Sequence, residues 1–480
     1  TTISQIRKEI KKQDSKKAFL ELLQGKESMI VAFLSDEDAK TRKNTALLIG
    51  DLKLEQAKDA LIAAYLNETT LYVKSAYLTA LGKLDVRENL EFFKNRLLEV
   101  KNQQVPAEEQ KHQGEEIREL NEIILKTEGA KKHQFTGFQM QHEMLLLTNR
   151  EQREVTFSEV KEIGASVQRK AELHPLGVLV FSKEVIPFTK LRTYRELLFP
   201  IHTNERIPAM PHRAAELLWH SDLYAFLTEC HEGDAPFFFR LEVKSAETKT
   251  EFVKKLGASL EKKSDWKLAN STTDYEIEIR LIEAKDGSFV PFLKLYSMKM
   301  KRFAYRKNAI AMSIHPATAA MLMYLAKPYL KENAQILDPC CGVGTMLIER
   351  DILVPAREKY GIDIFGDAID MARENAALAG EKINFIHRDY FDFKHDYKFD
   401  EIVTNMPVKG KKAKEDMDAF YARFFEKSKS LLAEDGIIIM YSNEVGFVKK
   451  QLRLQPCYRL IQEYTIRKKD SYCLFIIGMK

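Results

Sequence analysis

The sequence has few cysteines and no long hydrophobic run. Its five cysteines, Cys230, Cys340, Cys341, Cys457 and Cys473, form no Cys-x-x-Cys pair. An odd count without regular spacing argues against a disulfide framework and a zinc site, so we expect free thiols in a reducing compartment and no metal. No apolar run reaches the roughly 18 residues that a membrane helix needs, and the basic, polar residues 1–17 do not resemble a signal peptide. These absences predict a cytoplasmic protein without membrane contact.

Glycine and proline are also scarce, and the charges are nearly balanced. The 480 residues include 20 Gly and 14 Pro, with 45% hydrophobic and 30% charged residues, which excludes collagen-like, mucin-like and globally disordered chains. The net charge of +5 is too small to indicate nucleic-acid binding by itself. At about 150 residues per domain, the length predicts about three domains.

The first 130 residues predict consecutive helices, because Ala and Leu recur at helical spacing. Residues 41–52 realign on residues 73–84, and a second amphipathic helix follows each copy. A short helix pair that cannot bury its own face stacks on its neighbours, so the pattern resembles HEAT-type repeats. An irregular helical domain with one chance self-match is the alternative. Both interpretations predict a helical module without chemistry of its own, which docks a protein partner.

Short strand-like stretches alternate with helical ones in the next part of the chain, which predicts an α+β region. Residues 131–235 have no clear identity, whereas residues 236–310 are more regular. The elements expected in this second stretch are strands at 238–243, 275–282 and 288–296 and a helix at 248–262.

Positive charge is concentrated between Lys244 and Lys307, where 15 Lys and Arg face 9 Asp and Glu. Basic groups offer phosphate contacts and aromatic rings offer stacking faces, so the combination favours RNA binding. A solvated, lysine-rich surface is the alternative. The candidate RNA-binding residues are Lys299, Lys301, Arg302, Phe303, Tyr305, Arg306 and Lys307.

Residues 311–480 alternate strands and helices, which predicts a parallel α/β sheet. An apolar strand at 335–338 leads to Gly342 and Gly344, and a helix follows. Glycine is needed in such a turn because a Cβ would block a ligand that approaches the backbone amides. The third glycine of the dinucleotide fingerprint is missing, which counts against NAD or FAD.

Two acidic residues follow later strands in order. Asp363 lies some 20 residues after Gly344, where a carboxylate can accept from both ribose hydroxyls. Asp389 follows a third strand and can accept from an adenine amino group, while Ile364 and Tyr390 cover the ring. The glycine turn and the two acids together predict a cofactor that contains adenosine.

Asn405-Met406-Pro407 follows the strand at 399–403, at the edge where a parallel sheet presents its ligands. The Asn405 side-chain oxygen and the Met406 carbonyl can both accept from an exocyclic NH2 group, and Pro407 donates no competing hydrogen bond. Methyl transfer from an activated cofactor depends on positioning and desolvation, so no strong general base is expected.

These motifs resemble a known family. Residues 338–345, followed by Ile348 and Glu349, resemble motif I of class I S-adenosylmethionine methyltransferases that methylate exocyclic amines of nucleic-acid bases. Residues 302–306, 313–316 and 404–407 resemble THUMP-containing RNA guanine-N2 methyltransferases.

The resemblance implies S-adenosylmethionine as the cofactor, structured RNA as the substrate with tRNA favoured over rRNA, and a Rossmann-like fold that ends in an antiparallel hairpin. It assigns cofactor binding to Asp338, Cys341, Gly342, Gly344, Thr345, Asp363, Ile364, Asp389 and Tyr390, and catalysis to Asn405, Met406 and Pro407. The expected multidomain organisation is a HEAT-like all-α domain at 1–130, an α+β region at 131–235, a THUMP-like RNA-binding region at 236–310 and the α/β methyltransferase domain at 311–480.

One residue departs from the family pattern. Val408 stands where an aromatic residue usually stacks on the target base, and such stacking is worth about 1–3 kcal/mol per base. We expect another ring, Phe303 or Tyr305, to compensate. The following Lys409, Lys411 and Lys412 are candidate phosphate ligands or an ordinary lysine-rich loop. An adenine-N6 methyltransferase and a non-catalytic scaffold that binds S-adenosylmethionine remain alternatives.

His315 and Pro316 open the last domain. His315 either closes the cofactor pocket or caps the helix that begins at Pro316. Cys340 and Cys341 have no partner histidine at a recognisable spacing, so they are interpreted as buried filler and not as nucleophiles.

Overall fold

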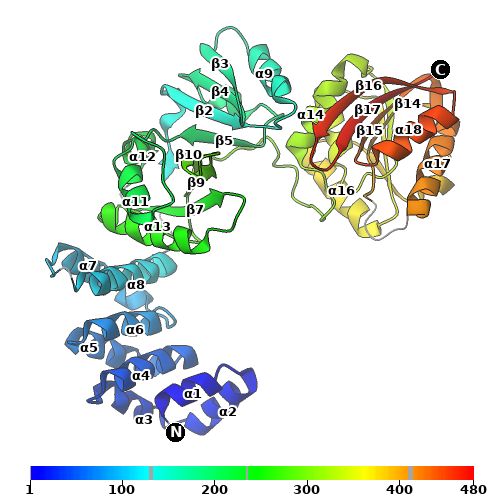
Figure 1. The fold of residues 1–480 in the computed structure, drawn as a ribbon. Coiled ribbons are helices and arrows are strands. Elements are labelled where there is room, and N and C mark those ends of the chain that lie inside the picture. Colours follow the sequence, from blue (N-terminus) through cyan, green and yellow to red (C-terminus); the bar gives the residue numbers. More distant parts are fainter. Residues whose placement is uncertain (1, 107, 129–132, 234–235, 409–413) are drawn as a thin grey trace. The chain divides into compact units, whose positions relative to one another are not determined.

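The computed structural model describes residues 2–106, 108–128, 133–233, 236–408 and 414–480. The chain forms two compact units (Figure 1). The first unit comprises Thr1–His133, Gly233–Phe238 and Glu261–Tyr275, and the second comprises Gln134–Glu232, Phe239–Leu260 and Glu276–Lys480. Within the described residues, no helix has the length and apolar character needed to span a bilayer.

The first unit is mainly a succession of helices, as the Ala and Leu spacing predicts. Its core extends from Ile10 to Ile123. The two self-similar segments form α4 and α6, which pack closely: a Cβ at Gly50 would lie 2.7 Å from the Cα of Ala80. The HEAT-like identity of these helices stays a prediction. The helices are α1 (Ile3–Glu9), α2 (Gln13–Leu23), α3 (Glu27–Val31), α4 (Ala39–Leu52), α5 (Lys58–Asn67), α6 (Leu71–Leu81), α7 (Leu90–Asn102) and α8 (Gln110–Glu128).

The α+β part of the second unit contains one sheet that continues across the boundary expected at 235–236. Seven of the eight strands of this sheet follow the order β3-β4-β2-β5-β10-β9-β7. Strands β5 and β10 pair antiparallel with Phe199 opposite Leu293, and this pair joins the two expected regions. The THUMP-like identity of residues 236–310 stays a prediction. The strands are β2 (His142–Leu147), β3 (Arg169–His174), β4 (Gly177–Ser182), β5 (Glu196–Pro200), β7 (Phe237–Lys244), β9 (Ile277–Glu283) and β10 (Phe289–Leu295).

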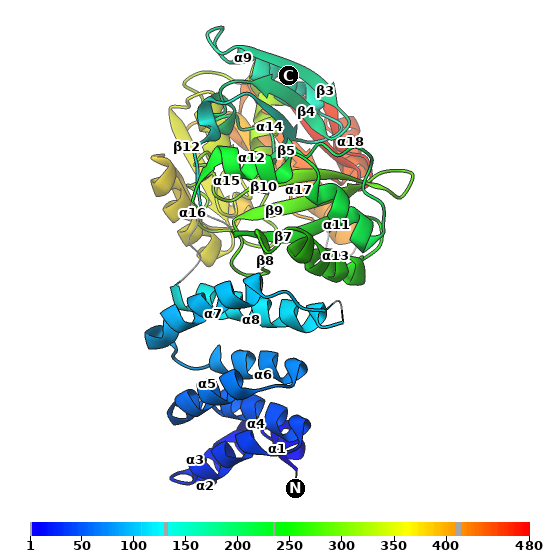
Figure 2. The ribbon, with the colours of Figure 1, turned by 90° about the vertical axis from the view of Figure 1, so that its left-hand side faces the viewer.

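Helices lie beside this sheet in both views (Figures 1 and 2). The ring of Phe226 in α12 lies 5.0 Å from that of Phe199 in β5, so α12 packs directly on the sheet. The helices of this part are α9 (Arg153–Glu162), α10 (Ile186–Thr189), α11 (Pro211–Trp219), α12 (Leu223–Cys230) and α13 (Thr250–Lys263).

The C-terminal sheet has the order β13-β12-β11-β14-β15-β17-β16. The first five strands in this order, β13, β12, β11, β14 and β15, run parallel to one another. Strand β17 is antiparallel to both of its neighbours. The predicted antiparallel hairpin at the end of the chain is therefore present. The strands are β11 (Gln335–Asp338), β12 (Glu358–Asp363), β13 (Asn384–His387), β14 (Phe399–Asn405), β15 (Leu432–Ser442), β16 (Tyr458–Arg467) and β17 (Tyr472–Met479).

Helices cover both faces of this sheet. Successive residues of each strand point to opposite faces, so neighbouring residues contact different helices. Val403 and Ile439 share a core with α14 and α15, whereas Ile402 and Ile438 share a core with α17 and α18. Helix α16 packs on the same face as α15. The helices are α14 (Pro316–Ala326), α15 (Thr345–Leu353), α16 (Gly366–Ala379), α17 (Lys414–Leu431) and α18 (Val445–Leu454).

Candidate functional site

The glycine turn and Asp363 meet at the carboxyl ends of the adjacent strands β11 and β12. The Gly342 N–H donates to Asp363 Oδ2 at 2.8 Å, and the Phe365 N–H donates to Oδ1 at 3.0 Å. Gly342 has φ +50°, and a Cβ there would meet no atom within 4 Å, so this part of the turn faces open space. Gly344 has φ +82°, and a Cβ there would lie 2.8 Å from the Phe385 ring, so only glycine fits. The turn can therefore receive a ligand close to its backbone.

Three buried side-chain oxygens beside the turn make no hydrogen bond of normal geometry with a described residue, although the Thr404 hydroxyl lies near enough to Asp338 to act on it as a weak hydrogen-bond partner. They are Asp338 Oδ2 at the end of β11, Thr345 Oγ1 at the start of α15 and Thr404 Oγ1 next to Asn405 in β14. A buried polar atom without a partner costs about 1–3 kcal/mol. These atoms therefore fit a polar ligand that would satisfy them, and together with Gly342 and Asp363 they define the candidate cofactor pocket.

Burial changes the titration of the acidic and thiol groups in this turn. Burial raises the pKa of Asp338 to about 8, and the nearby charge of Asp363 adds to the increase. The Cys340 N–H, which donates to Asp338 Oδ1 at 3.1 Å, and the Thr404 hydroxyl both lower this pKa and partly oppose the effect of burial. Asp338 therefore holds a proton at neutral pH. Burial also raises the pKa of the Cys341 thiol well above its usual value, which agrees with the interpretation of Cys341 as buried filler.

The two residues expected to bind an adenine ring have different surroundings. Asp389 is exposed after β13, and its Oδ1 accepts from the Phe391 N–H at 2.9 Å. Tyr390 is only 4% exposed, and its hydroxyl bonds with Ser428 Oγ at 2.9 Å inside the core. The prediction that the Tyr390 ring covers a ligand is therefore wrong, because hydrophobic packing turns this ring inward.

Ile364 is 58% exposed beside Asp363, so its side chain remains accessible as expected. Sequence reasoning missed Phe365, which is 63% exposed and lies two residues after the acid. The signal was an aromatic residue placed just after a strand-end carboxylate, where a side chain can reach a bound ring.

The Asn405 turn lies at the end of β14, beside β11. The Met406 N–H donates to the Tyr441 carbonyl at 2.9 Å, and the Met406 residue is 3% exposed, so this residue anchors the turn. Asn405, Pro407 and Val408 are half-buried. No described residue makes a hydrogen bond with the Asn405 side-chain amide. This amide is therefore available to a substrate at the edge that also carries the glycine turn.

Two candidate RNA-binding residues are used within the second unit. The Arg302 guanidinium donates to three backbone carbonyls in residues 191–195, at 3.0, 2.6 and 2.8 Å. Tyr305 is 5% exposed, and its hydroxyl donates to Glu349 at 2.6 Å. These contacts contradict the expectation that Arg302 and Tyr305 present their side chains to RNA, because the polar groups of both already have protein partners.

The remaining candidates differ in exposure. The Phe303 ring already contacts the guanidinium groups of Arg192, 4.9 Å from its centroid, and Arg302, 4.6 Å from it. The buried Tyr305 therefore offers no stacking face in place of the aromatic missing at Val408, and the half-buried Phe303 ring already has two guanidinium groups beside it. Solvent is accessible to the side chains of Lys299, Lys301 and Lys307. Arg306 is half-buried. Lys409, Lys411 and Lys412 lie outside the described residues.

Asn375 of α16 is a further residue that the sequence did not reveal. It is fully buried, and its Oδ1 accepts from the Asn308 N–H at 3.0 Å. Its Nδ2 donates to the Asn308 carbonyl at 3.0 Å and to the Val343 carbonyl at 3.2 Å. Asn375 therefore ties the segment after the basic stretch to the glycine turn. An asparagine inside a helix gives no sequence signal for such a role.

His315 caps helix α14. Its Nδ1 accepts from the Ala317 N–H at 3.1 Å, and Pro316 occupies the first turn of the helix. The cap interpretation of His315 is confirmed.

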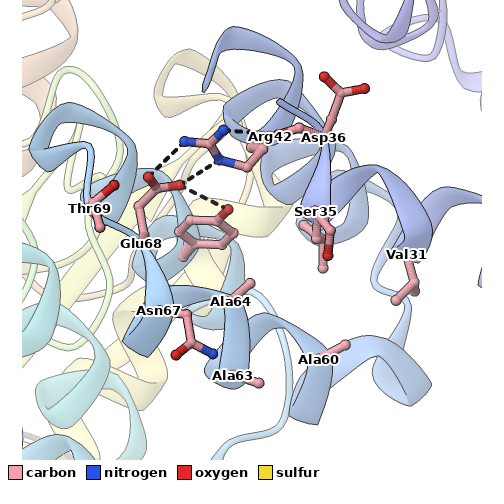
Figure 3. Close-up of a pocket in the computed structure, with 12 residues that line it drawn as sticks. Val31, Ser35, Asp36, Arg42, Ala60, Ala63, Ala64, Asn67, Glu68 and Thr69 are labelled. Carbon is pink, nitrogen blue, oxygen red and sulfur yellow. Dashed lines mark hydrogen bonds and ion pairs between the residues drawn. The ribbon is translucent and has the colours of Figure 1, made fainter. Parts of the chain in front are cut away.

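A pocket of about 530 Å³ lies in the first unit (Figure 3). Arg42 Nε and Nη2 each donate to the Glu68 carboxylate at 2.8 Å, and the Tyr77 hydroxyl donates to it at 3.3 Å. The charged groups of Arg42 and Glu68 in this pocket thus satisfy each other. That the helical module has no chemistry of its own stays a prediction.

Comparisons with known proteins identify the type of the C-terminal domain. Residues 304–467 match the family described as RMKL-like, methyltransferase domain, which confirms the methyltransferase resemblance. A tRNA (guanine(10)-N2)-dimethyltransferase of Methanothermobacter thermautotrophicus is 33% identical over 162 residues, covering 33% of this chain and 46% of that protein. The U6 snRNA (guanine-N(2))-methyltransferase THUMPD2 of Bos taurus is 26% identical over 192 residues, which cover 39% of this chain and 36% of that protein. The chain thus spans less than half the length of these relatives.

The fold is also found in a solved structure. SMU.472, crystallised in complex with SAH, aligns with a TM-score of 0.53 and 14% identity over 70% of this chain and 98% of that chain. At this identity the likeness concerns the fold alone. The methyltransferase domain makes S-adenosylmethionine the cofactor. The glycine turn, Asp363 and the three buried oxygens are the candidate groups to hold it.

Proposed function

We propose that this chain, whose residues 304–467 are a methyltransferase domain of the RMKL-like type, transfers a methyl group from S-adenosylmethionine to guanine N2 in structured RNA, with tRNA as the first candidate. The observation that carries the proposal is the Asn405 amide at the end of β14, which bonds with no described residue and lies beside the glycine turn on β11. The names of the two guanine-N2 methyltransferase relatives support the choice of atom and of RNA.

The residues of the pocket divide the binding of the cofactor among them. S-adenosylmethionine supplies an activated methyl group when it is bound. The backbone of Gly342 and Gly344 allows close approach, Asp363 accepts from ribose hydroxyls and Asp389 accepts from the adenine amino group. Buried Asp338, Thr345 and Thr404 offer partners to the polar remainder of the cofactor.

The Asn405 turn orients the target amine. The Asn405 side-chain oxygen and the Met406 carbonyl accept from the two N–H groups, so that the nitrogen lone pair points at the methyl group. Guanine N2 is barely basic, so its proton leaves late, through Asn405 to water. Positioning and exclusion of water supply most of the rate enhancement, and the burial of Met406 keeps the turn in place.

The first unit has a separate role in this proposal. Its helices form their own core, and the charged groups of Arg42 and Glu68 in its pocket are already paired. We therefore infer that this unit docks a protein partner while the second unit performs the chemistry.

Methyl transfer from labelled S-adenosylmethionine to total RNA from cells that lack this protein tests the proposal. Digestion of the RNA and mass analysis should identify N2-methylguanosine as the labelled nucleoside, and fractionation should place it in tRNA. Labelled N6-methyladenosine would move the target to adenine. Binding of S-adenosylmethionine without label in any RNA would indicate a scaffold or a different substrate.

A further inference from the structure

Two arginines approach the first turn of α14, from different parts of the second unit. Arg195 lies just before β5, and its Nη2 reaches Thr318 Oγ1 at 3.4 Å. Arg306 lies near the end of the basic stretch, and its Nη2 donates to the Ile314 carbonyl at 3.1 Å. Both arginines therefore hold positions beside His315, the residue that caps this helix.

The positive charge of these two arginines is not neutralised within the described part of the chain. Neither guanidinium forms an ion pair there, and Arg306 Nε is buried without a hydrogen-bond partner. Arg195 is exposed, and its contact with Thr318 is long. The neighbouring Glu196 forms no ion pair with either arginine, because its carboxylate already binds Arg280 and, at 2.5 Å, Lys294.

The same accumulation of charge acts on His315. Desolvation and the positive charges of Arg195, Arg306 and Arg302 all lower the pKa of His315. The ring is therefore neutral at pH 7. Because Nδ1 accepts from the Ala317 N–H, the proton of the neutral ring lies on Nε2, which is a hydrogen-bond donor.

The cluster lies close to the Asn405 turn. Ile314, whose carbonyl accepts from Arg306, packs against the core cluster that contains Tyr441, whose carbonyl accepts from the Met406 N–H at 2.9 Å. Tyr441 is also the residue opposite Asn405 in the pairing of β14 with β15. An anion held by Arg306 would therefore lie on the same part of the domain as the Asn405 turn.

We propose that Arg195, Arg306 and His315 form a binding site for one backbone phosphate of the substrate RNA, next to the nucleotide that is methylated. This inference rests on the proposed function. Guanidinium groups bind phosphate oxygens with strong, charge-assisted hydrogen bonds, and the imidazole N–H adds a third donor. The unpaired Arg306 Nε gives such an anion a ready partner.

The carboxylate of S-adenosylmethionine is a second oxyanion with the same chemistry. The placement of Arg195 favours the phosphate. The groups assigned to the cofactor, from Asp338 to Asp389, all lie within the matched domain at 304–467, whereas Arg195 comes from the α+β part. A cation that reaches the site from outside this domain suits a ligand that spans both parts, as an RNA chain does.

The test compares Arg195→Gln with wild type in the full chain. Bulk tRNA is the RNA probe, its dissociation constant is measured over a salt series, and S-adenosylmethionine affinity is measured by calorimetry. Arg213→Gln is the matched control, because Arg213 is an exposed arginine whose charge is already paired with Glu205 at 2.6 Å and Glu216 at 3.0 Å.

We expect Arg195→Gln to weaken tRNA binding about tenfold, because it removes one charge-assisted interaction. The slope of log affinity against log salt should fall by roughly 0.7–0.9, the change expected when a protein neutralises one phosphate fewer. Arg195→Lys should recover most of the affinity, since it restores the positive charge. Arg213→Gln should change neither quantity, and S-adenosylmethionine affinity should stay within about twofold in every variant.

Each alternative outcome has a distinct meaning. Unchanged tRNA affinity and salt slope in Arg195→Gln would overturn the phosphate site. Weaker S-adenosylmethionine binding in this variant would instead assign the anion to the cofactor carboxylate and also overturn it. A wild-type chain that binds tRNA but methylates no RNA would refute the proposed function, while the effect of Arg195→Gln on tRNA binding would still decide the site. A wild-type chain that binds no RNA would overturn both proposals.

Discussion

Arg192 binds Glu349 through two hydrogen bonds of 2.8 Å, and this pair joins the segment before β5 to helix α15. The Glu349 side chain is fully buried and also accepts from the Tyr305 hydroxyl at 2.6 Å. The remaining Arg192 nitrogen, Nη1, donates to the Arg302 carbonyl at 2.8 Å. The helix that begins at the glycine turn is therefore held against the α+β part by a buried ion pair.

We predict that Arg192→Met destabilises the second unit by about 3–5 kcal/mol, because it leaves the Glu349 carboxylate buried and unpaired. Urea unfolding followed by aromatic fluorescence measures the change. Arg213→Met is the control, since exposed arginines contribute about 0–1 kcal/mol. A change in Arg192→Met no larger than that of the control would contradict the role of the pair.

The sequence predicts well where a feature depends on the order of elements. Gly342 and Asp363 end successive parallel strands, so they meet at one edge of the sheet as expected. The sequence is a poor guide to the contacts of a side chain whose partner lies far away along the chain. Arg302 bonds with residues about 110 positions earlier in the chain, and Tyr390 turns into the core although it follows an exposed acid. Composition shows that a group is basic or aromatic, but not which contacts it makes.

The raised pKa of Asp338 predicts a pH dependence of stability. The folded-state pKa is about 8, whereas the ordinary value is 3.8, so the unfolded chain releases this proton at lower pH. This contribution to stability is full below pH 4 and is lost as pH rises toward 8, by up to about 1.4 kcal/mol per pH unit.

The comparison of wild type with Asp338→Asn isolates this effect. The variant cannot ionise at this position, so the wild-type free energy of unfolding should decrease relative to that of the variant between pH 5 and pH 8. Urea titrations at four pH values measure the difference. Parallel curves for the two proteins would show that Asp338 is ionised in the folded state at neutral pH.

Glu68 in the first unit should show the opposite dependence. Burial opposes its ionisation, but Arg42 and the Thr70 N–H outweigh burial and lower the pKa of Glu68 to about 2. The contribution is present above pH 4.5 and is lost as pH falls toward 2. The stability advantage of wild type over Glu68→Gln, measured by urea unfolding, should therefore shrink on acidification. Glu91→Gln, which alters an exposed carboxylate in the same unit, should show no comparable change.

Gly342→Ala tests whether the glycine turn receives the cofactor. A Cβ at Gly342 meets no protein atom within 4 Å, but it would occupy the space that faces the turn. Gly287→Ala is a matched control, because Gly287 has φ +78° and its Cβ would also meet nothing within 4 Å. Both variants carry a similar backbone cost of about 1 kcal/mol. Only Gly342→Ala should weaken S-adenosylmethionine binding, by at least tenfold in calorimetry. Equal affinities in the two variants would place the cofactor elsewhere.

Asn405→Ala separates catalysis from cofactor binding. The Asn405 amide makes no hydrogen bond with a described residue, so its removal should leave the fold and the glycine turn intact. Loss of one preorganised hydrogen-bonding group typically costs about 100-fold to 1,000-fold in kcat. We therefore expect kcat for RNA methylation to fall by at least 100-fold while S-adenosylmethionine affinity stays within a few-fold. Asn384→Ala, on the exposed start of β13, serves as the control and should retain full activity. If Asn405→Ala lost cofactor binding together with turnover, Asn405 would belong to the cofactor pocket and not to the amine site.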